Sequence, residues 1–414
     1  MNGIEQVSGD PLAGLDDIDW AGLQHAYGSA EDVPGQLRAL RSPDEKVREK
    51  ARWELYGNIF HQGSRYEATP HAVPFLIRMA RDPGTPEREG CVMLLSAIAI
   101  GYDEAWLPRG ADPGRWREEV ERLQATDPEQ VRRDLEAWVQ EAADENERRS
   151  REFRLTIHDH EANVRAAVWE LACYDAVRAG VPELTGLLED EDPRVRATTA
   201  YLLGFFPEEA PRTLPGLLRA ARTDPHAIVS AGLVGDASCA ERLRPYLGDE
   251  DPLRRCAAAL ALARLGAADE AVIGELAAVA AEPPGAQDDG EESGAPFLFM
   301  EGDLRGYAAA TLAALDGEVG ARAAEAMIEG LARTSQTGSF NTAAAVLQLV
   351  FGEPRQPLPP LEELTDLQRK AVRTLAEMGP ETWRWGNFMG ILRAWGLPSD
   401  RAELRAYARV PSED

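Results

Sequence analysis

The chain has 414 residues, too many for one ordinary hydrophobic core, because such cores stop growing at about 250–300 residues. It therefore forms two or three domains or an elongated array of repeats. Hydrophobic residues make up 44% and charged residues 28%, the composition of a folded protein. A net charge of −27 repels phosphate backbones, so we expect a basic or neutral protein partner, and neither nucleic acid nor a membrane.

The N-terminal segment, residues 1–33, is predicted to be a helical cap. It begins Met-Asn-Gly-Ile-Glu-Gln and lacks the basic region and apolar core of a signal peptide. No apolar run in the sequence is long enough to cross a bilayer. The four cysteines include no Cys-x-x-Cys pair, so we expect reduced and mostly buried thiols. These features predict a cytoplasmic location.

A polar segment follows the first predicted helical hairpin. If the helix that contains Val47 continues through Phe60, Gly63 then ends it. Four polar side chains gather at this break, and they are candidate contacts to a peptide or a small molecule: His61, Gln62, Arg65 and Tyr66. The alternative is a tightly hydrogen-bonded turn that fixes the first two hairpins against each other.

Residues 102–160 are expected to be an insertion of long helices. Glu129–Arg154 alternates acidic and basic residues over several turns, which predicts one solvated helix. His158 and His160, beside Asp159 and Glu161, have a spacing that metal ligands use. Glu161 already serves as the expected cap of the next helix, and no second ligand cluster exists. We therefore keep the two histidines as candidate partner contacts and predict no metal site.

A short pattern recurs along the chain: an acidic residue, two variable positions, an aliphatic residue, then Arg, leading into an Ala-rich helix. The acid is expected to cap the helix, and a following Pro tolerates its missing N–H. The Arg can reach back, or across to an acid of a neighbouring repeat. We interpret these residues as a structural ladder that fixes the stacking register. The ladder pairs are Asp44 and Arg48, Glu161 and Arg165, Asp192 and Arg196, and, with an altered aliphatic position, Asp251 and Arg255. The same pattern, again altered, also occurs from Glu301 to Arg305.

Between these helices lie segments such as Val181–Leu188, with Pro near the start and apolar residues at i, i+3, i+4 and i+7. No alternation typical of a strand is convincing, so the predicted fold is all-α. The pattern resembles the HEAT-repeat family, including the short bacterial HEAT-like units of phycobilin lyases. It matches well over 181–266, and less closely over 34–101 and 303–350. The N-terminal stretch also resembles a bacterial HEAT subgroup of unassigned role.

The resemblance implies a right-handed α-solenoid whose Asp-x-x-Val-Arg helices line the concave face. The expected organisation has an acidic loop insertion and a helical C-terminal cap. Its segments are the cap (1–33), HEAT-like repeats (34–101), the long-helix insertion (102–160), regular repeats (161–281), an acidic mobile loop (282–302), further HEAT-like repeats (303–351), and a linker with the C-terminal cap (352–414).

Two later segments have alternative interpretations. Within 282–302, the apolar tip Phe297–Met300 either docks on the repeats or touches a partner. Near the C-terminus, Trp383, Trp385 and Trp395 either seal the last helical layer or form an aromatic binding patch.

The sequence predicts a non-catalytic scaffold or adaptor, of which an inhibitor or immunity-type protein would be one form. No phosphate loop, Gly-x-Ser-x-Gly or Gly-x-Gly-x-x-Gly motif is present, and no cofactor is expected. The alternative is a HEAT-fold enzyme or small-ligand binder. HEAT-fold iron hydroxylases use several His-Glu pairs, and this chain has only His160-Glu161. HEAT-like DNA glycosylases have a basic groove, which the acidic composition disfavours.

Overall fold

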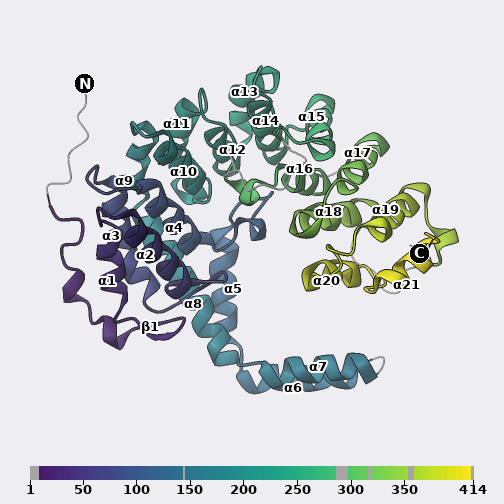
Figure 1. Ribbon diagram of the computed structural model, residues 1–414, viewed down its shortest axis with the longest axis horizontal. Coiled ribbons are helices and arrows are strands. Elements are labelled where there is room, and N and C mark those ends of the chain that lie inside the picture. Colours follow the sequence, from purple (N-terminus) through teal and green to yellow (C-terminus); the bar gives the residue numbers. More distant parts are fainter. Residues whose placement is uncertain (1–8, 143–144, 286–296, 316–318, 353–358, 412–414) are drawn as a thin grey trace. The chain divides into compact units, whose positions relative to one another are not determined.

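The structure is a computed structural model that describes residues 9–142, 145–285, 297–315, 319–352 and 359–411. The chain divides into two units, residues 1–102 with 112–202 (unit 1) and residues 103–111 with 203–414 (unit 2). Both consist of antiparallel helices packed in sequence order (Figure 1). The predicted all-α fold of helical hairpins is confirmed. The acidic part of the predicted mobile loop, residues 286–296, lies outside the described residues.

Unit 1 begins with small β-hairpins between its first helices. Its strands and helices are β1 (Gln24–His25), β2 (Gly28–Ser29), α1 (Val33–Ala39), α2 (Glu45–Asn58), β3 (Phe60–His61), β4 (Ser64–Arg65), α3 (Thr69–Arg81), α4 (Arg88–Ile100), α5 (Pro113–Ala125), α6 (Pro128–Gln140), α7 (Glu145–Ile157), α8 (His160–Ala179), α9 (Val181–Leu184) and α10 (Pro193–Leu203). The last residue of α10, Leu203, already belongs to unit 2.

Unit 2 continues the helical pairs. Its helices are α11 (Ala210–Ala220), α12 (Pro225–Val234), α13 (Ala240–Leu243), α14 (Pro252–Arg264), α15 (Glu270–Ala281), α16 (Leu304–Ala313), α17 (Ala321–Leu331), α18 (Phe340–Phe351), α19 (Asp366–Glu377), α20 (Gly386–Ala394) and α21 (Arg401–Ala408). Alanine and leucine fill its core, and every residue from Cys256 to Ala263 on α14 is buried. Small side chains let neighbouring helices approach closely, and the Cβ of an alanine at Gly232 would lie 2.6 Å from Ala261.

The expectation that the first repeat helix continues through Phe60 is wrong. Helix α2 ends at Asn58, and Phe60 opens the antiparallel β3–β4 hairpin. At its turn, Gln62 and Gly63 have φ values of 50° and 88°, a left-handed conformation that reverses the chain and cannot extend a helix. A second hairpin, β1–β2, precedes α1. Strand periodicity could not indicate either hairpin, because each strand is only two residues long.

The single long helix predicted over Glu129–Arg154 is also wrong. The chain forms α6 and α7, which pack side by side as an antiparallel hairpin (Figure 1). The Arg151 guanidinium lies 4.6 Å from the centre of the Trp138 ring, and Val139 is buried. A straight solvated helix would leave both apolar side chains in water, so folding back is favoured.

Most predicted caps are confirmed, with two corrections. Asp44 and Asp251 accept hydrogen bonds from backbone N–H groups of the first turns of α2 and α14. Asp192 likewise accepts from the Arg194 N–H at 2.8 Å. Helix α8, however, is capped by Asp159 and α16 by Asp303, not by Glu161 and Glu301. The shorter Asp side chain reaches the N–H groups of the first turn, which is why Asp is preferred at this position.

The repeated arginines stabilise the turn that precedes their own helix. Arg196 donates to the carbonyls of Asp190 and Glu191, at 2.8 and 3.0 Å. Arg48 and Arg255 make the same two bonds, five and six residues upstream. Arg165 is different, because it lies 3.8 Å from Glu161 on the exposed face of α8. Three of the four predicted ladder arginines therefore bind backbone carbonyls, which fixes the turn between the helices of adjacent pairs.

Ion pairs between successive hairpins of unit 1 provide the contact between repeats. Arg48 and Arg52 both pair with Glu87, the residue that precedes α4. Arg88 makes two hydrogen bonds of 2.7 Å to Asp190, 102 residues further along the chain. These bonds join the start of α4 to the turn that precedes α10.

The two remaining alternatives concern unit 2. In the Phe297–Met300 tip, Phe297, Phe299 and Met300 are buried, and Phe297 stacks on His226 with ring centres 5.2 Å apart. The tip therefore docks on its own unit. At the C-terminus, Trp383 is buried against Phe388, whereas Trp385 keeps 41% of its surface exposed.

Among the described residues, no helix combines the length and apolar character that a membrane crossing requires.

Candidate functional site

The tips of the two β-hairpins in unit 1 lie together. Ala26 donates to the carbonyl of Asn58 and Ala68 to that of Gln24, each at 3.0 Å, which ties the first hairpin to the second. The rings of Tyr27 and His61 then meet edge to face, with centres 5.4 Å apart. The Tyr27 hydroxyl and the His61 Nδ1 atom are 3.4 Å apart.

We call the surface at these tips the aromatic ledge. It consists of Tyr27, His61, Gln62, Tyr66 and Tyr102. Tyr102 lies against Gly63, where an added Cβ would come within 3.1 Å of its ring, and packs edge to face on Phe60. Tyr27 is 70% and Tyr102 48% exposed. Desolvation raises the pKa of the partly buried Tyr66 hydroxyl. The ledge thus presents three tyrosines and an imidazole to solvent.

A buried histidine holds the first tip rigid. His25 Nδ1 accepts from the Tyr27 N–H at 3.0 Å, so Nε2 carries the proton that is donated to Asp32 at 3.0 Å. Asp32 also accepts from the side-chain amides of Gln36 and Asn58. This network fixes the backbone of Tyr27 without using its side chain.

Arg65 lies beneath the ledge and is only 5% exposed. Its Nη1 donates to the Gly63 carbonyl at 2.5 Å, and its Nη2 lies 3.6 Å from Glu170 on α8. Burial raises the pKa of Glu170 and lowers that of Arg65, and each effect is opposed by the partner's charge. The structure places Arg65 inside the second hairpin, whereas His61, Gln62 and Tyr66 reach its surface.

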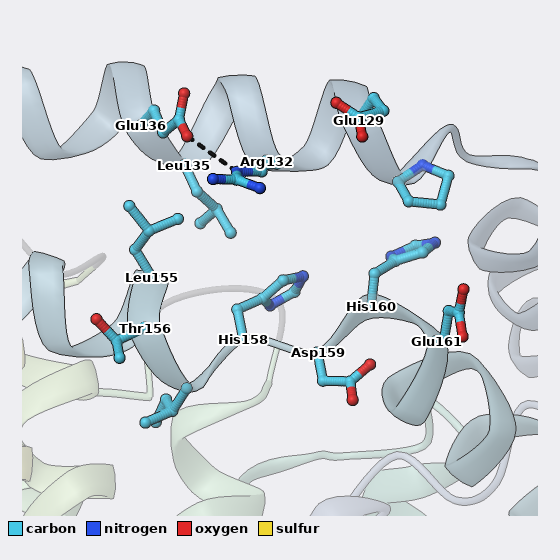
Figure 2. A pocket seen from close by; sticks show the side chains of 12 residues that line it. Glu129, Arg132, Leu135, Glu136, Leu155, Thr156, His158, Asp159, His160 and Glu161 are labelled. Carbon is cyan, nitrogen blue, oxygen red and sulfur yellow. Dashed lines mark hydrogen bonds and ion pairs between the residues drawn. The ribbon is translucent and has the colours of Figure 1, made fainter.

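The second group of predicted contacts lines a cleft of about 790 Å³ between α6 and the α7–α8 junction (Figure 2). His158 and His160 both project from the junction toward α6. On α6, Arg132 and Glu136 form an ion pair of 3.0 Å. Apolar side chains complete the walls, among them Leu135, Leu155 and Ile157.

The cleft does not gather metal ligands. The His158 and His160 rings are 6.3 Å apart, and the Asp159 carboxylate accepts from the Ala162 N–H at 2.9 Å as the cap of α8. In the described part of the chain, no three His, Cys, Asp or Glu side chains are arranged to hold a metal ion. The cleft offers imidazole, guanidinium and carboxylate groups on apolar walls, which suits a peptide or small organic ligand.

The two predicted groups do not form one site. Glu170 lies beside Arg65, whereas His160 opens the same helix ten residues earlier, which separates the two positions by about 15 Å along α8. The cysteines offer no nucleophile nearby, because burial raises the pKa of Cys91, Cys173 and Cys256 to about 12.

Sequence reasoning missed Tyr27 and Tyr102, the most exposed side chains of the ledge. The available signal was a local duplication. His25-Ala-Tyr-Gly-Ser29 and His61-Gln-Gly-Ser64 both place a His shortly before Gly-Ser, and both fold as hairpins. Tyr102 lies 38 residues after Ser64, and only packing on Gly63 brings it to the ledge.

No curated protein is significantly similar to this chain in sequence. The crystal structure of an engineered protein aligns with 92% of this chain and 97% of its own, at 16% identity and with a TM-score of 0.25. A TM-score this low carries no argument. Residues 153–234, which run from α7 to α12, match the HEAT repeat family. The resemblance to HEAT repeats is therefore confirmed for this stretch of the chain.

Proposed function

We propose that this protein is a non-catalytic scaffold that holds a basic protein segment on the aromatic ledge. The observation that carries the proposal is the exposure of Tyr27, whose backbone is held by His25, and of Tyr102, whose ring packs on Gly63 and Phe60. Tyrosine has few rotatable bonds and offers both apolar surface and a hydroxyl, so an ordered, exposed tyrosine pair has the composition of a binding hot spot. HEAT repeats are commonly protein-interaction scaffolds, which supports the same class of function.

The chemistry of the ledge favours a cationic occupant. Tyrosine faces attract guanidinium and ammonium groups. Two carboxylates pair with residues of the hairpins that carry the ledge: Asp32 pairs with His25 and has a side chain 47% exposed, and Glu170 pairs with Arg65 and has a side chain 31% exposed. The net charge of −27 would also speed the association of a basic partner. Inhibition of a basic toxin or enzyme is one form that this function would take. The four cysteines form no disulfide, which supports a cytoplasmic location for this function.

The test uses the full chain and a fluorescent arginine-rich peptide, with a glutamate-rich peptide as the charge control. In the double variant Tyr27→Ala/Tyr102→Ala we expect affinity for the basic peptide to fall at least about tenfold. Phe153→Ala removes another exposed aromatic side chain, 63% exposed on α7, and is the matched control. Equal affinity in all three proteins would show that the peptide senses only net charge, and the ledge proposal would fail.

A second candidate function rests on the cleft in Figure 2, where two imidazoles face apolar and charged walls. There the protein would be a small-ligand binder or an enzyme with His158 or His160 as an acid–base group. The double variant His158→Gln/His160→Gln separates the two functions. If His158→Gln/His160→Gln lost binding of the arginine-rich peptide while Tyr27→Ala/Tyr102→Ala kept it, the cleft would be favoured as the binding site.

A further inference from the structure

Unit 2 contains a pocket whose charge is opposite to that of the whole protein. Its volume is about 580 Å³, a size that small-molecule sites commonly have. Among the described residues that line it, the charged ones are Arg109 and Arg264, and none is acidic. The remaining lining is small or apolar: Pro108, Ala263, Gly266, Ala268, Thr311, Ala314 and Leu315. In a chain with a net charge of −27, a pocket whose described lining contains two arginines and no carboxylate requires an explanation.

The loop that carries Arg109 is firmly attached to unit 2. Asp103, at its start, is buried and accepts from the Met300 N–H at 2.9 Å. Leu107 is buried, and the Gly110 N–H donates to the Trp106 carbonyl at 2.8 Å. The backbone of this loop is therefore a fixed wall of the pocket.

Close packing at Gly110 brings the loop that carries Arg109 against Arg264. A Cβ at Gly110 would lie 3.6 Å from Arg264 Nε and 3.5 Å from Leu233, so the loop runs directly past the Arg264 guanidinium. Gly110 has a φ of 82°, which glycine adopts without strain. Arg109 is the preceding residue, so both guanidiniums border the same space.

Neither arginine is neutralised by the part of unit 2 that the structure describes. Arg109 and Arg264 are exposed, and no hydrogen bond or ion pair to a described residue involves either side chain. Asp269, which follows the lining residue Ala268, is instead paired with Arg244 at 2.5 Å, and Asp316, which follows the lining residue Leu315, lies outside the described residues. The C-terminus of α14 offers Arg264 about half a negative charge, so the described residues leave most of the charge of the two arginines uncompensated.

We infer that this pocket binds a small molecule or terminus that carries an oxyanion, either a phosphate or a carboxylate. Guanidinium groups bind both anions through paired N–H···O bonds. Distant carboxylates do not prevent this, because charges are screened beyond about 8 Å at physiological salt. The site belongs to unit 2 and is independent of the ledge in unit 1.

The experiment titrates the full chain with inorganic pyrophosphate and with citrate, and follows binding by calorimetry and by the shift in melting temperature. We expect at least one probe to bind. Arg109→Gln and Arg264→Gln should each weaken that binding about tenfold, because each removes a charge-assisted pair of hydrogen bonds. Preference for pyrophosphate or for citrate distinguishes a phosphate ligand from a carboxylate ligand.

The matched control is Arg322→Gln on α17, an exposed arginine outside the pocket that also makes no hydrogen bond or ion pair to a described residue. It changes net charge by the same amount and should leave binding unchanged. Arg264→Lys keeps the charge but loses the planar fork, so it should bind at an intermediate level. Absence of binding by both probes at millimolar concentration, or an equal loss in Arg322→Gln, would overturn the inference.

Discussion

The two ends of helix α14 use arginine in opposite ways. At its start, Arg255 donates to the carbonyls of Asp249 and Glu250 and lies 3.4 Å from Glu275. At its end, Arg264 borders a pocket and has no such partner among the described residues. The same side chain on the same helix therefore stabilises the fold at one end and is available to a ligand at the other. The number of partners that a guanidinium has, rather than its presence, separates these roles.

The largest expected effect tests the structural role where it is strongest. Arg88→Ala removes both 2.7 Å bonds to Asp190, and the two side chains are only 14% and 10% exposed. A carboxylate left buried and unpaired costs several kcal/mol, so we expect the free energy of unfolding to fall by about 3 kcal/mol. Urea denaturation of both proteins measures this. If Arg88→Ala lowered the free energy of unfolding by no more than Arg322→Gln, a substitution at an exposed arginine, the structural role of Arg88 would be contradicted.

The same ion pair predicts a pH dependence. Burial alone would raise the pKa of Asp190, but hydrogen bonds from Arg88 and from the Asp192 N–H outweigh it, so the pKa is lowered. A carboxyl whose pKa is lower in the folded state contributes stability above its unfolded pKa, near 4, and loses it as the pH falls through the folded value.

We therefore expect the stability difference between the wild type and Arg88→Ala to be largest at neutral pH and to shrink below about pH 4. Melting temperatures measured between pH 3 and pH 7 test this expectation. The value of about 4 is the ordinary pKa of an aspartate in an unfolded chain. A difference that grows on acidification would mean that the carboxylate is not what Arg88 stabilises.

Arg255→Ala should have an intermediate effect. It removes two bonds to backbone carbonyls and a looser pair with Glu275, at a side chain that is 31% exposed. Hydrogen bonds to charged groups contribute about 1.5–3 kcal/mol each when fully protected, so partial exposure leaves an expected loss of about 2 kcal/mol. Arg255→Lys should recover little, because one ammonium cannot reproduce the planar fork. Recovery of full stability by Lys would show that only charge matters.

The sequence predicted these helix caps well because their signals are local. A capping Asp, a Pro and an Ala-rich stripe act within one helix, so Asp44, Asp192 and Asp251 could be identified without tertiary information. The β3–β4 hairpin was missed because a left-handed Gln62-Gly63 turn overrides the preference of the preceding residues for helix.

The candidate sites were less predictable, because they depend on contacts between distant residues. Tyr102 reaches the ledge only through its packing on Gly63, and Arg109 lines the same pocket as Arg264 because the loop containing Gly110 packs against Arg264 and Leu233. No spacing in the sequence records either approach. Arg65 shows the converse, since a polar residue in a promising segment lies inside the hairpin.

The smallest expected effect is the most informative for the two ends of α14. Arg264→Gln removes no bond to the described part of the protein, so it should change the free energy of unfolding by less than about 0.5 kcal/mol without ligand. With the bound oxyanion, the wild type should gain stability that the variant does not, because a ligand stabilises only the state that binds it. Denaturation of both proteins with and without the probe measures both quantities. A loss of about 2 kcal/mol without ligand, as at Arg255, would show that Arg264 is structural as well, since a guanidinium free to bind an anion cannot already be holding the fold.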